Sequence, residues 1–297
     1  MKKTLSTMVA ALLCVALFGG CGSQPAPASS STPSSSSQAA SSEAPTSSEA
    51  PASSTQDVAA SDGLPETFIV GLDASFPPMG FLNQNNEVIG VDIDLAKAVC
   101  EKLGMKFEAK PIEWDAKDME LSSDKITCIW NGLTVNEERA EIYELSEAYM
   151  ENEQVIVVLE NAEISGKADL EGKIVAAQKD SSGLSALQAD EIYASIQGGA
   201  AKEYSNYVEA LTDLEIGRCD AVVMDSVVAD YYITQNAKPM KILEEKMAAE
   251  QYAIAFKKGN TALKDAVWGA LQELAAEGKV ADISHQWFGK DDVIQIS

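Results

Sequence analysis

From residue 64 onward, short runs of β-branched and apolar residues alternate with amphipathic stretches of helical period. The first part of this region reads, in order, TFIVGL, VDIDLAKAVCEKLG, KFEAKPIEW, DAKDMELSS and ITCIWNGLTV. Strand, helix, strand, helix and strand in succession predict a mostly parallel sheet with helices on its faces. The apolar stripe of the first predicted helix is formed by Ile93, Ala96, Val99, Cys100 and Leu103. The chain is therefore predicted to belong to the α/β class.

A second set of alternating segments follows and indicates a second, similar α/β lobe. Its members are GKIVAAQ, SSGLSALQADEIYAS, AKEYSNYVEALTDLEIG, DAVVMD, SVVADYYITQN and MKILEE. The chain then reads YAIAFKKG and ends with two helical stretches. Open α/β sheets bind ligands at the carboxyl ends of their strands, so we expect a ligand site among the loops between the two lobes.

The first residues have the layout of an export signal. Lys2 and Lys3 precede an apolar run over residues 8–18, and small residues then lead to Cys21. The apolar run is shorter than the roughly 20 residues that a bilayer span needs. Residues 17–21 resemble a bacterial lipobox, which implies a signal peptide over residues 1–20 and a diacylglycerol on Cys21. An ordinary signal peptide with an incidental cysteine is the alternative.

Residues 21–63 are predicted to be a lipid-anchored, disordered tether. After the cysteine they consist mainly of Ser, Ala, Pro, Thr and Gln, with no aromatic residue and no Lys or Arg up to residue 62. Such a composition cannot bury enough apolar surface to offset its chain entropy. We therefore expect the folded part to be held, by a lipid and a spacer, at the extracellular face of the cytoplasmic membrane.

Charge and cysteine usage exclude several classes of function. The 297 residues include 22 Lys and Arg against 46 Asp and Glu, a net charge of −24, which repels a phosphate backbone. Nucleic-acid binding is therefore not expected. Cys100, Cys128 and Cys219 lie in apolar runs, and no His/Cys metal spacing occurs, so we expect no metal and no cofactor. These cysteines are interpreted as buried free thiols, with one disulfide as the alternative.

Several segments resemble, in this order, the extracellular solute-binding proteins of polar amino-acid ABC transporters. They are VGLDASFPPMGF, EVIGVDIDLAKAVCEKLG, NGLTVNEERAEIYELSEAYM, LEGKIVAAQKDSSG, GRCDAVVMDSVVADYY, EQYAIAFKKGNTAL and GKVADISHQWFG. The resemblance covers residues 68–291. It implies a monomeric lipoprotein that captures an amino acid and delivers it to a membrane permease, without chemical change.

The fold implied by this resemblance is the type II periplasmic-binding fold, with two α/β lobes joined by a two-strand hinge. Lobe 1 is predicted to comprise residues 64–152 and 251–297, and lobe 2 residues 153–250. The hinge strands are expected near residues 151–157 and 251–255. Closure of the lobes over the ligand would be stabilised by contacts made only in the closed state.

A free amino acid that leaves water needs partners for both its carboxylate and its ammonium, because an unpaired buried charge costs several kcal/mol. Arg139 lies five residues after Thr134 on a predicted strand-to-helix turn, so its guanidinium and the Thr134 hydroxyl can close on one carboxylate. The resemblance implies that Ser182 reaches the same carboxylate from lobe 2 and that Asp225 binds the ammonium. The alternatives are a surface arginine at 139 and a helix cap at 225.

The resemblance also assigns the residues around the ligand's side chain, which are Asp73, Phe76, Trp114, Asn131 and Gly132. Phe76 and Trp114 could instead belong to the core. Trp130, which precedes Asn131, is expected to be part of the same pocket. Asn131 can donate and accept hydrogen bonds, which favours a polar side chain such as that of cystine, glutamine or a basic amino acid. The stretches WDAKDMEL and CIWNG are somewhat similar to cystine-binding members.

Three further features complete the sequence-based interpretation. Asp180 stands where the family usually has glycine, which bears on the backbone of that loop. Asp92 and Asp94 are interpreted as helix-start residues outside the site, and His285 as structural. The alternative functions are a dehydratase of the same fold acting on a prephenate-like acid, and a ligand sensor for a receptor.

Overall fold

The computed structural model describes residues 63–297. The predicted signal peptide, the lipidated Cys21 and the predicted tether up to residue 62 lie outside the described residues. Among residues 63–297, none of the helices has the length and apolar character that a bilayer crossing requires.

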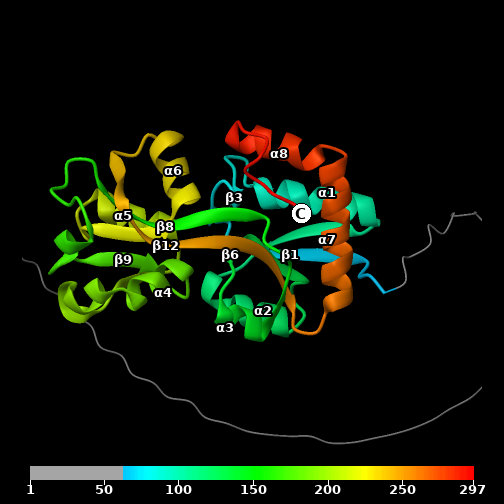
Figure 1. The fold of residues 1–297 in the computed structure, drawn as a ribbon, viewed down its shortest axis with the longest axis horizontal. Coiled ribbons are helices and arrows are strands. Elements are labelled where there is room, and N and C mark those ends of the chain that lie inside the picture. Colours follow the sequence, from blue (N-terminus) through cyan, green and yellow to red (C-terminus); the bar gives the residue numbers. More distant parts are fainter. Residues whose placement is uncertain (1–62) are drawn as a thin grey trace, which may run out of the picture. The chain divides into compact units, whose positions relative to one another are not determined.

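One nine-stranded sheet forms the centre of the described chain (Figure 1). In chain order its strands are β1 (Thr67–Leu72), β5 (Lys106–Pro111), β6 (Cys128–Thr134), β7 (Tyr143–Leu145), β8 (Met150–Leu159), β9 (Val175–Gln178), β10 (Lys202–Tyr204), β11 (Ala221–Asp225) and β12 (Met240–Lys257). Their spatial order is β10-β9-β11-β8-β12-β6-β1-β5, and β7 also pairs with β12. A small antiparallel sheet contains β2 (Ser75–Phe76), β3 (Gly80–Leu82) and β4 (Val88–Ile89).

Eight α-helices are present between residues 63 and 297. They are α1 (Val91–Leu103), α2 (Lys117–Ser122), α3 (Glu137–Ile142), α4 (Ser182–Ala189), α5 (Tyr207–Glu215), α6 (Ser226–Thr234), α7 (Thr261–Ala276) and α8 (Lys279–Phe288). Short 3₁₀ turns are η1 (Trp114–Ala116), η2 (Lys167–Leu170), η3 (Glu191–Ser195) and η4 (Gln197–Gly199). The α/β class predicted from the sequence is therefore confirmed.

The sheet is mixed, which corrects the expectation of a mostly parallel one. β1 pairs in parallel with β5 and β6, and β9 pairs in parallel with β10 and β11. The two long central strands β8 and β12 run antiparallel to each other and to their neighbours β11 and β6. One half of the sheet contains β1, β5 and β6, and the other contains β9, β10 and β11. Both long strands run between these two halves, as Figure 1 shows, and they do so in opposite directions. The lobe boundaries near residues 152 and 250 stay a prediction.

The stretch MKILEE and the first six residues of YAIAFKKG, which are separate stretches in the sequence pattern, belong to the single 18-residue strand β12. The pairing of β12 with β8 shifts register between Ile242 and Lys246, and again between Lys246 and Ala248. Such bulges add residues to one strand and bend it without ending it. One strand thereby serves both halves of the sheet.

Helix α1 shows how the local sequence sets the packing. Ile93, Ala96 and Val99 of its predicted apolar stripe are fully buried. The helix is preceded by Gly90 and followed by Gly104, whose left-handed backbone places its N–H on the Cys100 carbonyl oxygen. α7 and α8 pack against α1, so the last part of the chain completes the half of the sheet that the first part begins.

Cys100, Cys128 and Cys219 are buried free thiols in this structure, as the sequence predicted. Burial raises the pKa of the Cys100 thiol, and that of Cys219, to about 12. Protonated, buried thiols of this kind behave as small apolar side chains.

Two glycines give a matched test of this packing. Gly90 has φ 142°, and a Cβ there would lie 2.2 Å from the carbonyl oxygen of Met79, so we expect Gly90→Ala to lower the free energy of unfolding by about 3 kcal/mol. Gly269, inside α7, has open space at its Cβ position, so Gly269→Ala should raise it by up to about 1 kcal/mol. Urea denaturation of the purified variants measures both, and equal effects of the two substitutions would contradict the packing at Gly90.

Candidate functional site

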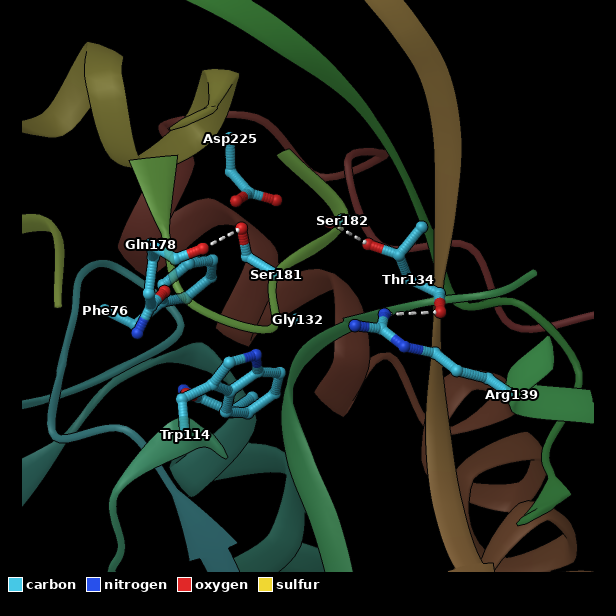
Figure 2. Close-up of a pocket in the computed structure, with 10 residues that line it drawn as sticks. Phe76, Trp114, Gly132, Thr134, Arg139, Gln178, Ser181, Ser182 and Asp225 are labelled. Carbon is cyan, nitrogen blue, oxygen red and sulfur yellow. Dashed lines mark hydrogen bonds between the residues drawn. The ribbon is translucent and has the colours of Figure 1, made fainter. Parts of the chain in front are cut away.

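A cavity with about 260 Å³ of empty space, partly open to solvent, lies at the carboxyl ends of strands β6, β9 and β11 (Figure 2). Its lining residues are Phe76, Trp114, Asn131, Gly132, Thr134, Arg139, Gln178, Ser181, Ser182 and Asp225. Eight of the nine residues predicted for a ligand site are in this set, and Asp73 is the one that is not. The geometry thus brings most of the predicted residues together, while their role in ligand binding stays a prediction.

Arg139 is a buried cation on helix α3, which follows strand β6. The side chain of Asn136 accepts the Arg139 backbone N–H at 2.8 Å and so begins helix α3, which fixes where the arginine stands. Its Nη1 donates to the Thr134 carbonyl oxygen at 2.8 Å. Only 7% of Arg139 is exposed, and it forms no salt bridge with any acid of the described chain. The surface-arginine interpretation is therefore wrong.

Asp225 is a buried acid on the opposite side of the same cavity. One of its carboxylate oxygens accepts from Tyr252 Oη at 2.7 Å and from Asn152 Nδ2 at 3.0 Å, and the other from Tyr207 Oη at 3.2 Å. It is 3% exposed and pairs with no Lys or Arg of residues 63–297. Burial, and then the nearby negative charge of Glu250, raise the pKa of the Asp225 carboxyl above its usual range.

The alternative role of Asp225 was a helix cap. The residue does stand at the position before α6, but its side chain makes no capping hydrogen bond. Its carboxylate instead accepts hydrogen bonds from the tyrosine and asparagine side chains around the cavity, so the capping interpretation is wrong.

The turn between β9 and α4 supplies hydroxyl groups from the second half. Ser181 caps α4, since its Oγ accepts the Leu184 N–H at 3.1 Å while its hydroxyl donates to the Gln178 carbonyl oxygen at 2.7 Å. Ser182 Oγ accepts from Thr134 Oγ1 at 2.9 Å. Figure 2 shows this contact bridging the cavity between β6 and the β9–α4 turn.

Asp180 retains the backbone geometry that glycine would supply. Its φ is 57°, in the left-handed region that aspartate tolerates better than most residues. Its carboxylate forms a salt bridge with Lys117, which is 3% exposed and comes from the other half of the sheet. A second such pair joins Lys179 and Asp115 at 2.6 Å. Asp180 thus supplies a charged contact between the two halves.

Asp73 lies behind the cavity wall. Its carboxylate accepts from Ser75 Oγ at 2.5 Å, from the Ser75 N–H at 2.9 Å and from Gln178 Nε2 at 2.7 Å. Burial raises the pKa of Asp73, which is 7% exposed. The contact with Gln178 joins the two halves, so Asp73 is placed to support the lining residue Gln178.

Gln178 and Ser181 line the cavity and were not predicted from the sequence. The signal for Gln178 was available, because it ends the buried strand β9 just as Asp225 ends β11. Ser181 was recognisable as the residue before an amphipathic helix. Both follow from the rule that strand ends and helix starts meet at one edge of such a sheet.

The aromatic residues are divided between wall and core. Phe76 lines the cavity, and its ring centroid lies 6.0 Å from that of Tyr207. Trp114 also lines the cavity, and the Lys117 Nζ lies 5.4 Å from its ring centroid. Trp130 was expected to be part of the pocket but is fully buried and packs near Tyr149, with ring centroids 6.4 Å apart. Successive side chains of a strand point to opposite faces, so Trp130 and Asn131 cannot both face the cavity.

Asp92 supports the floor of the cavity from helix α1. Its carboxylate accepts the Gly132 N–H at 2.8 Å and the Tyr149 O–H at 2.9 Å. Gly132 has φ 58°, and a Cβ there would lie 3.0 Å from the rings of Phe76 and Tyr252, so a larger residue would be strained at this position. Asp92 does not line the cavity, in agreement with its structural interpretation. Complete burial raises its pKa to about 7.

Other candidates lie elsewhere. Within residues 63–297, no group of His, Cys, Asp and Glu is arranged to hold a metal ion. His285 is exposed, and its Nδ1 lies 2.7 Å from the Asp291 carboxylate on the surface of α8. It has no part in the cavity.

The raised pKa of Asp92 predicts a pH dependence of stability. In the unfolded chain this carboxyl ionises near its ordinary pKa of 3.8, whereas in the folded protein burial raises the pKa to about 7. The stability that Asp92 contributes is therefore greatest below about pH 4 and is lost as the pH rises to 7. We expect the free energy of unfolding of the wild type, minus that of Asp92→Asn, to fall between pH 4 and 7 and then to level off.

Asp94→Asn is the matched control, because Asp94 lies two residues further along α1 and its side chain is 26% exposed. A constant difference between the wild type and Asp92→Asn from pH 4 to 8 would show that Asp92 ionises in the folded protein at an ordinary pH.

Comparison with known proteins identifies the family. Residues 68–290 match the bacterial extracellular solute-binding proteins, family 3. The L-cystine-binding protein TcyJ of Escherichia coli (strain K12) is 28% identical over 227 residues, which are 76% of this chain and 84% of that protein. A histidine-bound substrate-binding protein of a Streptococcus pneumoniae ABC uptake transporter is 34% identical, with a TM-score of 0.75, over 77% of this chain and 94% of that one.

A third similar structure is an ancestral arginine-binding protein bound to glutamine. It is 39% identical, with a TM-score of 0.70, and the match covers 76% of this chain and all of that one. These likenesses confirm the predicted type II periplasmic-binding fold. The chain is a member of the bacterial extracellular solute-binding proteins, family 3.

Proposed function

We propose that this protein captures a polar amino acid outside the cell, closes its two halves around it and delivers it to the permease of an ABC transporter. One observation carries the proposal. Arg139 and Asp225 line the same cavity, are both buried, and lack an oppositely charged partner within the described chain. Two such charges of opposite sign are costly unless a ligand with both charges pairs with them.

The carboxylate end of the amino acid is assigned to Arg139, Thr134 and Ser182. A guanidinium presents several N–H groups in a plane. Within the described chain, the guanidinium of Arg139 makes one hydrogen bond, to the Thr134 carbonyl oxygen. Ser182 Oγ accepts from Thr134 and from Gln154 Nε2 at 3.1 Å, which leaves its own proton free to donate to a carboxylate. The ammonium is assigned to Asp225.

The side chain of the amino acid is assigned to Phe76, Trp114, Asn131 and Gly132, with Gln178 beside them. Aromatic faces together with amide groups suit a polar side chain. Relatives named for binding cystine, histidine and glutamine support a polar amino acid such as cystine, glutamine or a basic one. Asp73 is proposed to act in this region as well, and its bond to Gln178 supports a role in holding that amide in place.

Contacts that join the two halves across the cavity support the proposal that the halves close over the ligand. Thr134 with Ser182, Asp73 with Gln178 and Lys117 with Asp180 all pair residues from opposite halves. Lobe 1 is proposed to comprise residues 64–152 and 251–297, and lobe 2 residues 153–250. Contacts present only when the lobes are closed, together with those made by the ligand, stabilise the closed form.

The protein is proposed to act without catalysis. A dehydratase acting on a prephenate-like acid would need a cleft without an acid for the ligand's ammonium, whereas Asp225 lines this cavity. A sensor for a receptor would share the same site and differ only in its partner. Transport is favoured over sensing because the chain belongs to a solute-binding family and is predicted to carry a lipid anchor.

We expect a polar amino acid to raise the thermal unfolding midpoint of the purified protein. A ligand at 100 times its Kd stabilises the folded state by about 2.7 kcal/mol, which for a protein of this size is roughly 5 °C or more. Differential scanning fluorimetry against each protein amino acid and cystine measures the shift. Arg139→Ala and Asp225→Ala should each abolish it.

Arg218→Ala is the control for the arginine variant, because Arg218 is an exposed residue that pairs with Asp213 at 3.4 Å, and its loss should leave the shift intact. The proposal fails if no amino acid stabilises the wild type, or if the Arg139 and Asp225 variants respond as the wild type does.

The protein is also proposed to be a monomeric lipoprotein at the extracellular face of the cytoplasmic membrane, anchored through Cys21. Cys21→Ala should prevent the incorporation of labelled palmitate in cells and shift the protein from the membrane fraction to the medium. Immunoblots of the two fractions measure this. A Cys21→Ala protein that still incorporates labelled palmitate would refute the anchor.

A further inference from the structure

The strands β8 and β12 carry three polar residues where they pass behind the cavity. Asn152 lies opposite Glu250 in the pairing of β8 with β12, and Gln154 lies opposite Asp225 in the pairing of β8 with β11. Asn152 is 5% exposed and Gln154 is fully buried. None of Asn152, Gln154 and Glu250 lines the cavity itself.

One carboxylate oxygen of Glu250 holds both amides. Glu250 Oε1 accepts from Asn152 Nδ2 at 2.6 Å and from Gln154 Nε2 at 2.9 Å. The same two nitrogens also donate into the cavity wall, Asn152 to Asp225 Oδ1 at 3.0 Å and Gln154 to Ser182 Oγ at 3.1 Å. Each NH₂ group has two hydrogens, so each amide uses one on Glu250 and one on a cavity residue.

The carboxylate determines which way the Gln154 amide faces. Gln154 Oε1 has no hydrogen-bond partner in the described chain, so only the Nε2 side of this amide is fixed. A carboxylate accepts hydrogen bonds and cannot donate them, so a reversed amide would point its oxygen at the Glu250 oxygen. Glu250 therefore keeps a donor directed at Ser182.

Asn152 is secured at both ends. Its Oδ1 accepts from Ser226 Oγ at 2.9 Å, while Glu250 and Asp225 share its Nδ2. The negative charge of Glu250 also lies close to Asp225, which favours a cation at that end of the cavity.

We propose that Glu250 is a positioning residue for the amino-acid site, because a single oxygen orients the two amides that support the ammonium-binding acid and the carboxylate-binding hydroxyl. This inference rests on the proposed function. Glu250 stands on β12, one of the two strands that run through both halves, so it connects the strand that would bend with the groups that would hold the ligand.

A ligand-free measurement tests the amide contacts. In the ¹H–¹⁵N spectrum of the full chain, Glu250→Ala should shift the side-chain NH₂ signals of both Asn152 and Gln154. Glu250→Gln retains an acceptor oxygen of the same reach and should preserve most of the wild-type signal positions. Glu244→Ala removes an equal charge from an exposed position on the same strand, away from both amides, and should leave both signals unchanged.

Calorimetric titration with L-cystine, L-glutamine, L-arginine and L-histidine then tests the effect on binding. For any probe that the wild type binds, Glu250→Ala should raise the Kd about tenfold or more, as expected for the loss of a hydrogen bond to a charged group. Glu250→Gln should recover part of this loss, and Glu244→Ala should bind as the wild type does. The combined Gln154→Ala and Glu250→Ala changes should cost less than the sum of the two.

The possible failures are distinguishable. Normal binding by a folded Glu250→Ala protein, or unchanged amide signals in it, would overturn the role of Glu250 while leaving the proposed function intact. A loss of affinity in Glu250→Ala without any recovery in Glu250→Gln would overturn it too. Absence of binding to all four probes by the wild type would overturn the proposed function, and with it the role of Glu250 in amino-acid binding.

Discussion

The arrangement of this protein depends on two buried ionisable side chains that have no oppositely charged partner within the described chain. Arg139 belongs to the half of the sheet that contains β1, β5 and β6, and Asp225 ends β11 in the other half. Each is almost fully buried, and each is held by neutral hydrogen-bonding groups such as the Thr134 carbonyl and the Tyr252 hydroxyl. Such groups orient a charge without neutralising it. In the proposed function, the stability that is lost in this way becomes binding energy for a ligand that carries both opposite charges.

The strands that join the halves are also those that order the site. β8 and β12 are long, antiparallel and continuous, so the two halves share backbone hydrogen bonds across the whole sheet. Their side chains form a second row behind the cavity wall, in which Glu250 contacts both Asn152 and Gln154. Closure and charge recognition are thus proposed to use the same segment of chain. A bend at β12 would move Glu250 and the amides it holds, together with the groups assigned to the ligand.

Much of the site was predictable because this fold places chemistry at strand ends and helix starts. Thr134 ends β6, Asp225 ends β11 and Ser182 begins α4, and each position is recognisable in the sequence. The direction of a side chain was harder to predict. Trp130 precedes the lining residue Asn131 in the chain but packs in the core, whereas Asp73 contacts the lining residue Gln178 without lining the cavity itself. The direction of the two long central strands was also missed, because local patterns do not record how distant strands pair.

The sequence by itself determined the α/β class, the helices and strands, and the motifs that match the family, since these follow from periodicity and from residues adjacent in the chain. Only the tertiary structure decided that Arg139 and Asp225 lack partners, that Asp180 keeps a left-handed backbone and pairs with Lys117, and that Glu250 reaches two amides at once. These contacts join residues far apart in the chain, and their existence depends on distances of a few ångströms. No local pattern encodes such distances, because they result from how the whole sheet packs.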